Sequence, residues 1–144
     1  QVRARTARAP HPFHAFGYVD NVEELMAVSD LLITKAGGVT VSEALAMGLP
    51  MLIYRPIPGQ EEGNTAYLLE HGTALAPRTP AMLHTSLETL LSDPARIEAM
   101  RRAAKQLARP DATDQVIAHL AALAARADAP STGQRTLAIS TPRT

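Results

Sequence analysis

The sequence KAGGVTVSEALAMGLP, which runs from Lys35 to Pro50, has the pattern of a strand end followed by a glycine turn, a short helix and a stop. Gly37 and Gly38 stand where the strand would give way to the helix, which we expect over residues 40–47. Gly48 then provides the C-terminal stop. A helix that only packs against its neighbours needs neither glycine at its start, whereas a helix start that holds an anion uses both.

Strands and helices alternate on both sides of this stretch. We expect strands over residues 13–19, 30–35 and 50–56, and a last short strand in the run TALAP at 73–77. The strand at 50–56 contains a continuous apolar run, which is typical of burial on both faces of a parallel sheet. The alternation predicts an α/β fold, namely a Rossmann-like parallel sheet with flanking helices.

The other helices have recognisable boundaries. The first would begin after Asp20, which offers an N-cap, and Glu23 three residues later completes a capping-box pattern. A helix over residues 64–71 would end at Gly72, and three further helical stretches lie within residues 80–126. The clearest of these three has an apolar face at helical spacing, formed by Val116, Ile117, Leu120 and Leu123.

Length and composition set limits on the class of protein. The chain has 144 residues, a formal net charge of zero and no cysteine. Such a length suffices for about one domain, and the net charge gives no reason to expect a nucleic-acid partner. The lack of cysteine excludes disulfides and cysteine metal ligands. No apolar run approaches the roughly 20 residues that a membrane span requires.

The two ends of the chain differ in character from its middle. We expect a loose segment at 1–12, a domain at 13–127 and a disordered, Pro/Ser/Thr-rich tail at 128–144. The chain does not begin with Met, and its first residues lack the apolar core of a signal peptide. We therefore expect it to be a piece of a longer protein.

Three loops would meet at one edge of the predicted sheet. In an open parallel sheet, the ligand crevice lies beyond the carboxyl ends of the strands. The loops at 17–21, 35–40 and 55–64 each follow a predicted strand, so all three belong to that edge. Their convergence predicts a binding site more strongly than any one of them does alone.

The glycine turn and Glu43 each have two interpretations. A helix start has unpaired N–H groups, and glycines let a phosphate approach them closely; the alternative is a plain tight turn. Thr40 and Glu43 match a capping box, in which the glutamate bonds to the N-cap backbone. The alternative is that the Glu43 carboxylate accepts hydrogen bonds from a ribose diol, as acidic residues do in other nucleotide sites.

The loop IPGQEEGN, residues 57–64, places amide and carboxylate groups at a second helix start. Such groups recognise sugar hydroxyls because they act as paired donors and acceptors. Three polar side chains follow the turn made by Pro58 and Gly59, namely Gln60, Glu61 and Asn64. The alternative interpretation is a solvated loop in which Asn64 serves as an N-cap.

Other kinds of chemistry find no support in the sequence. None of the five histidines has a metal-ligand spacing with Asp or Glu, so we expect no metal site. The chain contains neither a G-x-S-x-G motif nor a P-loop, so the sequence gives no basis for predicting a hydrolase or an NTPase. No catalytic residue can be named from the sequence.

The segment GYVDNVEELMAVSDLLITKAGGVTVSEALAMGLPMLIYRPIPGQEEGN resembles the C-terminal, donor-binding domain of GT-B glycosyltransferases. It is most similar to the diacylglycerol glycosyltransferases of the family 28 type, namely monogalactosyldiacylglycerol synthase and the bacterial processive diacylglycerol glucosyltransferases. A more distant likeness is to the transferase that adds N-acetylglucosamine in making lipid II. The resemblance covers about residues 16–123, and the combination of ITKAGG, SEALAMGLP and PGQEEGN is specific to it.

This resemblance implies a UDP-sugar donor, UDP-glucose or UDP-galactose, and no other cofactor. The backbone around Tyr18 and Val19 would meet the uracil, Glu43 would bind the ribose hydroxyls, and Lys35 would add positive charge. The diphosphate would be held at the helix start by Gly37, Gly38 and Thr40. The transferred sugar and the phosphates would be faced by the second loop, through Pro58, Gly59, Gln60, Glu61 and Asn64.

The resemblance also implies parts that this sequence lacks. The family has a separate N-terminal domain that binds the lipid acceptor, touches the membrane and supplies the residue usually taken as the general base. Its C-terminal domain opens with two further strands and a glycine-rich turn. We therefore expect the truncated donor half of a cytoplasmic-side enzyme that transfers a hexose to diacylglycerol by inverting displacement, inactive by itself.

Three alternatives remain beside this interpretation. The first is a non-catalytic module that binds a nucleotide sugar or a partner. The second is a transferase of the lipid II type. The third is a UDP-sugar epimerase on the same architecture, which would need catalytic carboxylates and histidines that the sequence does not identify.

Overall fold

The computed structural model describes residues 11–127 of the chain. The predicted tail at 128–144 and most of the predicted loose segment at 1–12 therefore lie outside the described residues. The chain divides into two compact units, Gln1–Arg109 and Pro110–Thr144. The described part of the second unit contains the helix α7, Ala112–Ala127, and everything that follows on the sheet concerns the first unit.

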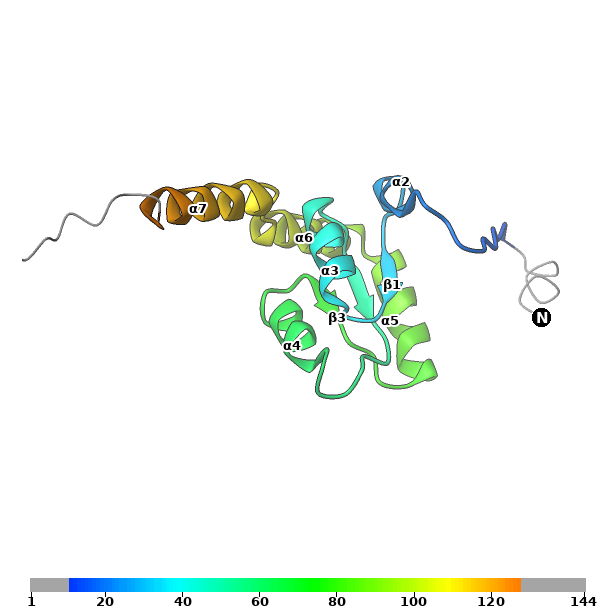
Figure 1. Ribbon diagram of the computed structural model, residues 1–144. Helices are drawn as coiled ribbons and strands as arrows, with labels where there is room; N and C mark the ends of the chain where they lie inside the picture. Colours follow the sequence, from blue (N-terminus) through cyan, green and yellow to red (C-terminus); the bar gives the residue numbers. More distant parts are fainter. Residues whose placement is uncertain (1–10, 128–144) are drawn as a thin grey trace, which may run out of the picture. The chain divides into compact units, whose positions relative to one another are not determined.

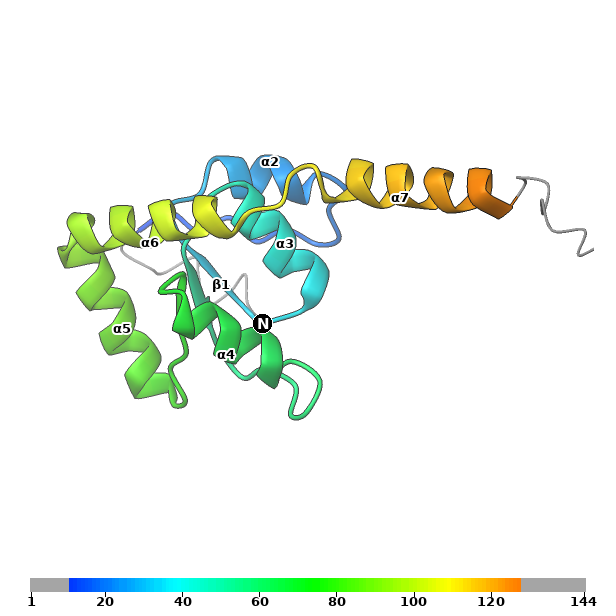
Figure 2. The same cartoon turned by 90° about the vertical axis from the view of Figure 1, so that its left-hand side faces the viewer.

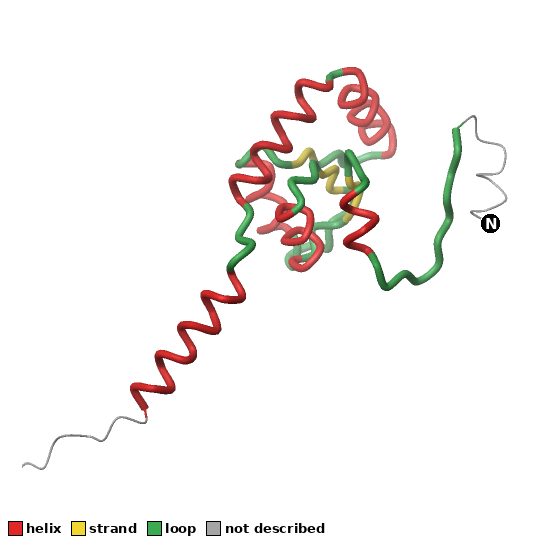
Figure 3. The backbone as a smooth tube through the Cα atoms, turned by 90° about the horizontal axis from the view of Figure 1, so that it is seen from above, coloured by secondary structure: helices red, strands yellow, loops and turns green. Residues whose placement is uncertain are grey.

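A three-stranded parallel sheet forms the centre of the first unit. The strand β2, Met51–Ile53, pairs with β1, Leu32–Thr34, on one side and with β3, Ala74–Leu75, on the other. All three residues of β2 are buried, as its apolar run predicts. Figure 3 shows these short strands surrounded by helices. The predicted Rossmann-like α/β fold is thereby confirmed.

Each step from one strand to the next crosses through a helix, because parallel neighbours cannot be joined by a hairpin. The helix α3, Gly38–Ala46, connects β1 to β2, and α4, Glu62–Glu70, connects β2 to β3. Met51 and Ile53 of β2 share one core cluster with the buried faces of these two helices, which are formed by Val41, Ala44, Leu45 and Leu68. Both crossovers therefore cover the same face of the sheet.

The opposite face of the sheet is covered by two later helices, α5, Pro80–Ser92, and α6, Pro94–Leu107. Leu52, the middle residue of β2, packs there with Leu90 and Met100. The residues of β2 thus alternate between the two faces, as the two-residue period of a strand requires. In Figure 1, α4 and α5 accordingly stand on different sides of the strands.

Both of these later helices begin with a cap followed by proline. The Thr79 hydroxyl accepts the Met82 N–H at 3.2 Å at the start of α5. The Asp93 carboxylate accepts the Arg96 N–H at 3.0 Å at the start of α6. A proline at the first helical position has no N–H that would need a partner, so these starts are fixed locally.

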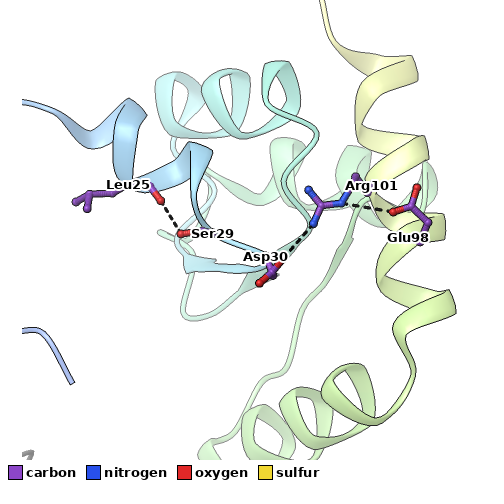
Figure 4. Close-up of polar contacts among 5 residues, drawn as sticks. All are labelled: Leu25, Ser29, Asp30, Glu98 and Arg101. Carbon is purple, nitrogen blue, oxygen red and sulfur yellow. Dashed lines mark hydrogen bonds and ion pairs between the residues drawn. The ribbon is translucent and has the colours of Figure 1, made fainter. Parts of the chain in front are cut away.

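The helix α6 runs past the amino ends of the strands (Figure 2). Arg101 forms an ion pair with Asp30, just before β1, at 3.5 Å and another with Glu98 at 3.6 Å, as Figure 4 shows. The stem of Lys105 lies against Gly48, just before β2. Surface ion pairs contribute little energy, about 0–1 kcal/mol, but these contacts show which edge α6 covers. The carboxyl edge is the one where the loops lie.

The predicted strand at 13–19 is wrong, because this segment has no regular structure. A strand needs a neighbour to bond its backbone, and within residues 11–127 β1 pairs only with β2. The side chains of Phe13, Phe16 and Tyr18 are accordingly exposed. The segment lacks both a pairing partner and a surface to cover.

The predicted capping box at Asp20 and Glu23 is also wrong. The helix α2, Val22–Ala27, has Asn21 as its N-cap, without a side-chain bond to the backbone. The Asn21 amide instead donates to the Glu24 carboxylate at 2.7 Å. The N-cap is therefore one residue later than expected. Its side chain bonds to Glu24 and does not cap the helix backbone.

The helix α7 confirms the predicted last helical stretch. Its apolar residues Val116, Ile117, Leu120 and Leu123 recur at helical spacing and so lie on one face of the helix. None of the helices within residues 11–127 combines the length and apolar character needed to cross a membrane.

The helices α3 and α4 end in the same way. Gly48 has a φ of 65°; its N–H donates to the Leu45 carbonyl at 2.9 Å, and the Leu49 N–H donates to the Ala44 carbonyl at 2.8 Å. This pair of bonds is a Schellman motif, which requires a left-handed residue. Gly72, with a φ of 68°, ends α4 through the same pattern. The two predicted glycine stops are confirmed.

We expect Gly48→Ala to destabilise the protein more than Gly72→Ala does. Both variants place a Cβ at a positive φ, which costs roughly 1–2 kcal/mol. A Cβ at position 48 would also lie 2.7 Å from Cγ of Lys105, whereas one at position 72 meets nothing within 4 Å. Moving the lysine off its rotamer adds about 0.5–1.5 kcal/mol. Urea unfolding of both variants measures the difference.

The control is the same substitution in a protein that lacks the lysine stem. In a Lys105→Ala background, Gly48→Ala should lose only as much free energy of unfolding as Gly72→Ala loses. Equal losses from the two glycine variants in the native background would contradict the expected role of Lys105.

Within residues 11–127 one edge of β1 has no partner strand, and we expect this edge to promote self-association. Ile33, the middle residue of β1, is 46% exposed, and an unpaired edge offers backbone groups to another chain. Ile33→Lys should shift the purified protein towards monomer in sedimentation velocity, because a charge on the edge opposes pairing. Val28→Lys, at a residue 82% exposed but outside the strands, is the control. If the native protein stayed monomeric at high concentration, that result would contradict this expectation.

Candidate functional site

Two loops leave the sheet at adjacent strand ends. Thr34, the last residue of β1, lies opposite Ile53, the last residue of β2, and the Tyr54 N–H donates to the Thr34 carbonyl at 2.8 Å. From this point residues 35–37 lead into α3, and residues 54–61 lead into α4. Two of the three predicted loops therefore leave the same edge of the sheet side by side.

Direct contacts join these two loops. The Asn64 side-chain amide donates to the Ala36 carbonyl at 2.9 Å, which links the first turn of α4 to the glycine turn. Oε1 of Glu61 lies 3.7 Å from the point where a Cβ of Gly37 would be. Asn64 is inside α4 and is not its N-cap, so that alternative is wrong. Its side chain instead fixes one loop against the other.

Glu61 is a buried carboxylate that closes its own loop. It is 7% exposed, and its Oε2 accepts the Ile57 N–H at 2.8 Å. Its own N–H donates to the Ile57 carbonyl at 3.0 Å. The turn enclosed by these bonds contains Pro58 and Gly59, which has a φ of 75°, and both are exposed, as is Gln60. Glu61 therefore holds the loop, while its neighbours present their groups to solvent.

The glycine turn begins α3 two residues earlier than expected. Gly37 is the N-cap and Gly38 the first helical residue, and no side chain caps this end. The first helical bond runs from the Val41 N–H to the Gly37 carbonyl at 2.9 Å. The N–H groups of Gly38, Val39 and Thr40 therefore have no partner within the helix. They form an uncapped, partly positive helix end at the carboxyl edge.

The fold itself requires neither of these glycines. Gly37 has a φ of −65° and a ψ of 137°, which any residue can adopt. A Cβ at Gly37 would make only an ordinary contact at 3.7 Å, and one at Gly38 would meet nothing within 4 Å. The two glycines instead leave the backbone N–H groups at the helix start uncovered by side chains. Gly48 and Gly72, by contrast, are needed because their φ is positive.

The capping-box interpretation of Glu43 is wrong. Thr40 is the third residue of α3, so it cannot serve as the N-cap that a Glu43 bond would complete. The Glu43 side chain is exposed and has no hydrogen bond or ion pair with any residue in the described range. It lies one turn beyond the bare N–H groups, on the helix face shared with Val39 and Thr40. Lys35 is exposed just before the turn.

The first predicted loop does not join this site. Tyr18 is 98% exposed, and Val19 is only partly covered. Because residues 13–19 form no strand, no strand pairing in the described part of the chain brings this loop to the carboxyl edge. Within residues 11–127, no group of three or more His, Asp or Glu side chains is arranged to hold a metal ion.

Sequence reasoning missed two features of this edge. The Ala36 carbonyl serves as an anchor for Asn64, which no residue pattern signals because any residue carries a carbonyl. A cavity of about 570 Å³ beside the second loop is lined by Arg55 and Arg78, which follow β2 and β3. An arginine shortly after β2 and another shortly after β3 were the available signal.

Comparison with known proteins gives a consistent result. A family model for the glycosyltransferase family 28 C-terminal domain matches residues 1–116. A processive diacylglycerol beta-glucosyltransferase of Bacillus cereus (strain AH187) is 39% identical over 108 residues, which are 75% of this chain and 28% of that protein. The corresponding protein of Bacillus thuringiensis (strain Al Hakam) is 38% identical over the same length. The chain thus spans less than a third of these relatives.

The fold also matches a solved structure. The crystal structure of MurG from Acinetobacter baumannii superimposes with a TM-score of 0.73 at 25% sequence identity, over 83% of this chain and 37% of that one. The parallel sheet, the bare helix start and the loop contacts described above all lie within the part matched by the family model. The chain therefore belongs to glycosyltransferase family 28, of which it carries the C-terminal domain.

Proposed function

We propose that the carboxyl edge of β1 and β2 binds the UDP part of a nucleotide-sugar donor. One observation carries this proposal: α3 begins with bare N–H groups at two glycines that the fold does not require. A helix start of this kind favours an anion through its free donors and its dipole. Gly37, Gly38 and Thr40 would hold the diphosphate, and Lys35 would add a positive charge.

Glu43 would bind the ribose of the same donor. Its carboxylate is exposed and free of partners among residues 11–127, and it follows the N–H groups by one helical turn. A carboxylate beside a diphosphate avoids repulsion when it faces the neighbouring sugar instead. Two adjacent ribose hydroxyls can donate to its two oxygens, which gives charge-assisted hydrogen bonds.

The second loop would face the transferred sugar. Because the Asn64 amide donates to Ala36, its Oδ1 remains available to accept from a sugar hydroxyl. Gln60 is exposed beside it and can both donate and accept. Pro58 and Gly59 shape the turn, and Glu61 holds it closed. Tyr18 and Val19 would reach the uracil once their segment pairs with a further strand.

For the longer protein, we propose transfer of a hexose from the UDP-sugar to diacylglycerol at the membrane. The named relatives are processive diacylglycerol beta-glucosyltransferases, and their identities of 39% and 38% favour this acceptor over that of MurG, which is 25% identical. The reaction would be an inverting displacement at the anomeric carbon. The departing UDP would be stabilised by the N–H groups at the start of α3. We assign no general base to this chain and expect it to have no transferase activity alone.

Glu43→Ala should weaken UDP binding strongly and leave the fold intact. Charge-assisted hydrogen bonds contribute roughly 1.5–3 kcal/mol each, so we expect the Kd for UDP to rise about tenfold to a hundredfold. The free energy of unfolding should change by less than about 0.5 kcal/mol, because Glu43 supports no cap. Calorimetric titration with UDP measures the first quantity, and urea unfolding measures the second.

Glu70→Ala is the matched control for this experiment. Glu70 is also an exposed helical glutamate, but it lies at the end of α4, next to the amino end of β3. The Glu70→Ala variant should bind UDP with the same Kd as the native protein. A well-folded Glu43→Ala protein with native UDP affinity would remove Glu43 from the proposed site.

A further inference from the structure

A cavity lies at the same edge of the sheet, near the carboxyl ends of β2 and β3. Its volume is about 570 Å³, which is within the roughly 300–1,000 Å³ range of small-molecule pockets. It is lined from three sides, by residues after β2, by residues after β3 and by one face of α4. None of the residues proposed to bind the UDP-sugar lines it.

Two arginines give this cavity its charge. Arg55 follows β2 and Arg78 follows β3, and both are exposed. Within the described residues, neither forms an ion pair: Asp30, Glu88 and Glu98 are the acidic residues whose ion pairs involve His84, Arg101 and Arg102. Among the lining residues, Glu62 is the one carboxylate. Two arginines and one glutamate therefore line the same cavity.

The backbone conformation of Arg55 is unfavourable for an arginine. Its φ is 54°, and within the described residues it is the one residue other than glycine with a positive φ. Left-handed backbone is unfavourable for an arginine, whereas a glycine would adopt it freely. An arginine at this position therefore costs the fold stability that a glycine would not cost.

The remaining wall of the cavity is apolar. It is formed by aliphatic and proline side chains, namely Ile53, Pro56, Ala66, Leu69, Ala76 and Pro77. An inorganic ion bound in the cavity would leave its apolar wall in contact with water. A ligand that combines an anionic group with a compact apolar group would match both parts of the lining.

We propose that this cavity binds a phosphate monoester, with the phosphate between Arg55 and Arg78 and the organic group against the apolar wall. Guanidinium groups form paired hydrogen bonds with phosphate oxygens, and two of them match the double negative charge of a monoester. A carboxylate would use only one of them fully. The site stands on residues other than those of the proposed donor site and does not depend on that function.

The test is a heteronuclear NMR titration of the purified chain with inorganic phosphate and with phenyl phosphate. Both should shift the signals of residues that line the cavity, including the Arg55 and Arg78 side-chain N–H groups. Phenyl phosphate should bind at least about fivefold more tightly, because its ring covers the apolar wall. Saturation with UDP should leave the cavity signals responsive to phenyl phosphate, whether or not UDP binds.

Four variants decide whether the arginines are responsible. The double variant Arg55→Gln with Arg78→Gln should weaken phenyl phosphate binding at least about tenfold, since it removes the charge-assisted bonds. Arg102→Gln, an exposed arginine on α6, is the control and should bind normally. Glu62→Gln should strengthen binding, because it removes the carboxylate from the cavity. Arg55→Gly should lose affinity although its melting temperature is equal to or above that of the native protein.

Arg55→Gly guards against loss of binding through misfolding, because glycine relieves the left-handed backbone. Native phenyl phosphate affinity in this variant or in the double variant would overturn the proposal. Signal shifts confined to residues 37–40 would also overturn it, since they would place the phosphate at the start of α3. Weaker binding by Glu62→Gln would contradict the charge arrangement.

Discussion

The burial of β2 between two parallel neighbours is the constraint on which the rest of the first unit depends. Met51, Leu52 and Ile53 are fully enclosed, so each face of the sheet must be covered and each edge of β2 must be paired. Parallel pairing forces a crossover helix after every strand, and both crossovers here cover the same face. All carboxyl strand ends then point to one edge. Because α6 lies past the amino ends of the strands, the loops that can bind a ligand are those at the carboxyl edge.

Glycine has two different functions in this unit. Gly48 and Gly72 are needed by the backbone, because each ends a helix in the left-handed region and lets the chain turn into the next strand. Gly37 and Gly38 are not needed by backbone conformation or by packing. They keep a helix end accessible instead. The fold thus needs Gly48 and Gly72 for their torsion angles, whereas the proposed donor site would use Gly37 and Gly38 for their missing side chains.

The second loop separates two positively charged regions along one edge. On one side, the bare start of α3 and Lys35 adjoin Glu43, and Asn64 fixes the glycine turn by its bond to Ala36. On the other side, Arg55 and Arg78 line a separate cavity. Glu61, buried between the loop and the glycine turn, holds the loop in place without entering the cavity. The two regions are therefore lined by different residues at one edge of the sheet.

The sequence by itself determined the alternation of strands and helices, the buried character of β2, the glycine stops and the family, because these depend on local periodicity and on short motifs. It could not decide where α3 begins, since Thr40 with Glu43 and the Gly37–Gly38 pair were both acceptable starts. In the structure the helix begins at the glycines, with Gly37 as its N-cap. It could not decide whether residues 13–19 form a strand, because a strand exists only beside a partner. It also could not place Arg55 beside Arg78, which are distant in sequence. Only the parallel pairing of β2 with β3 brings their strand ends together.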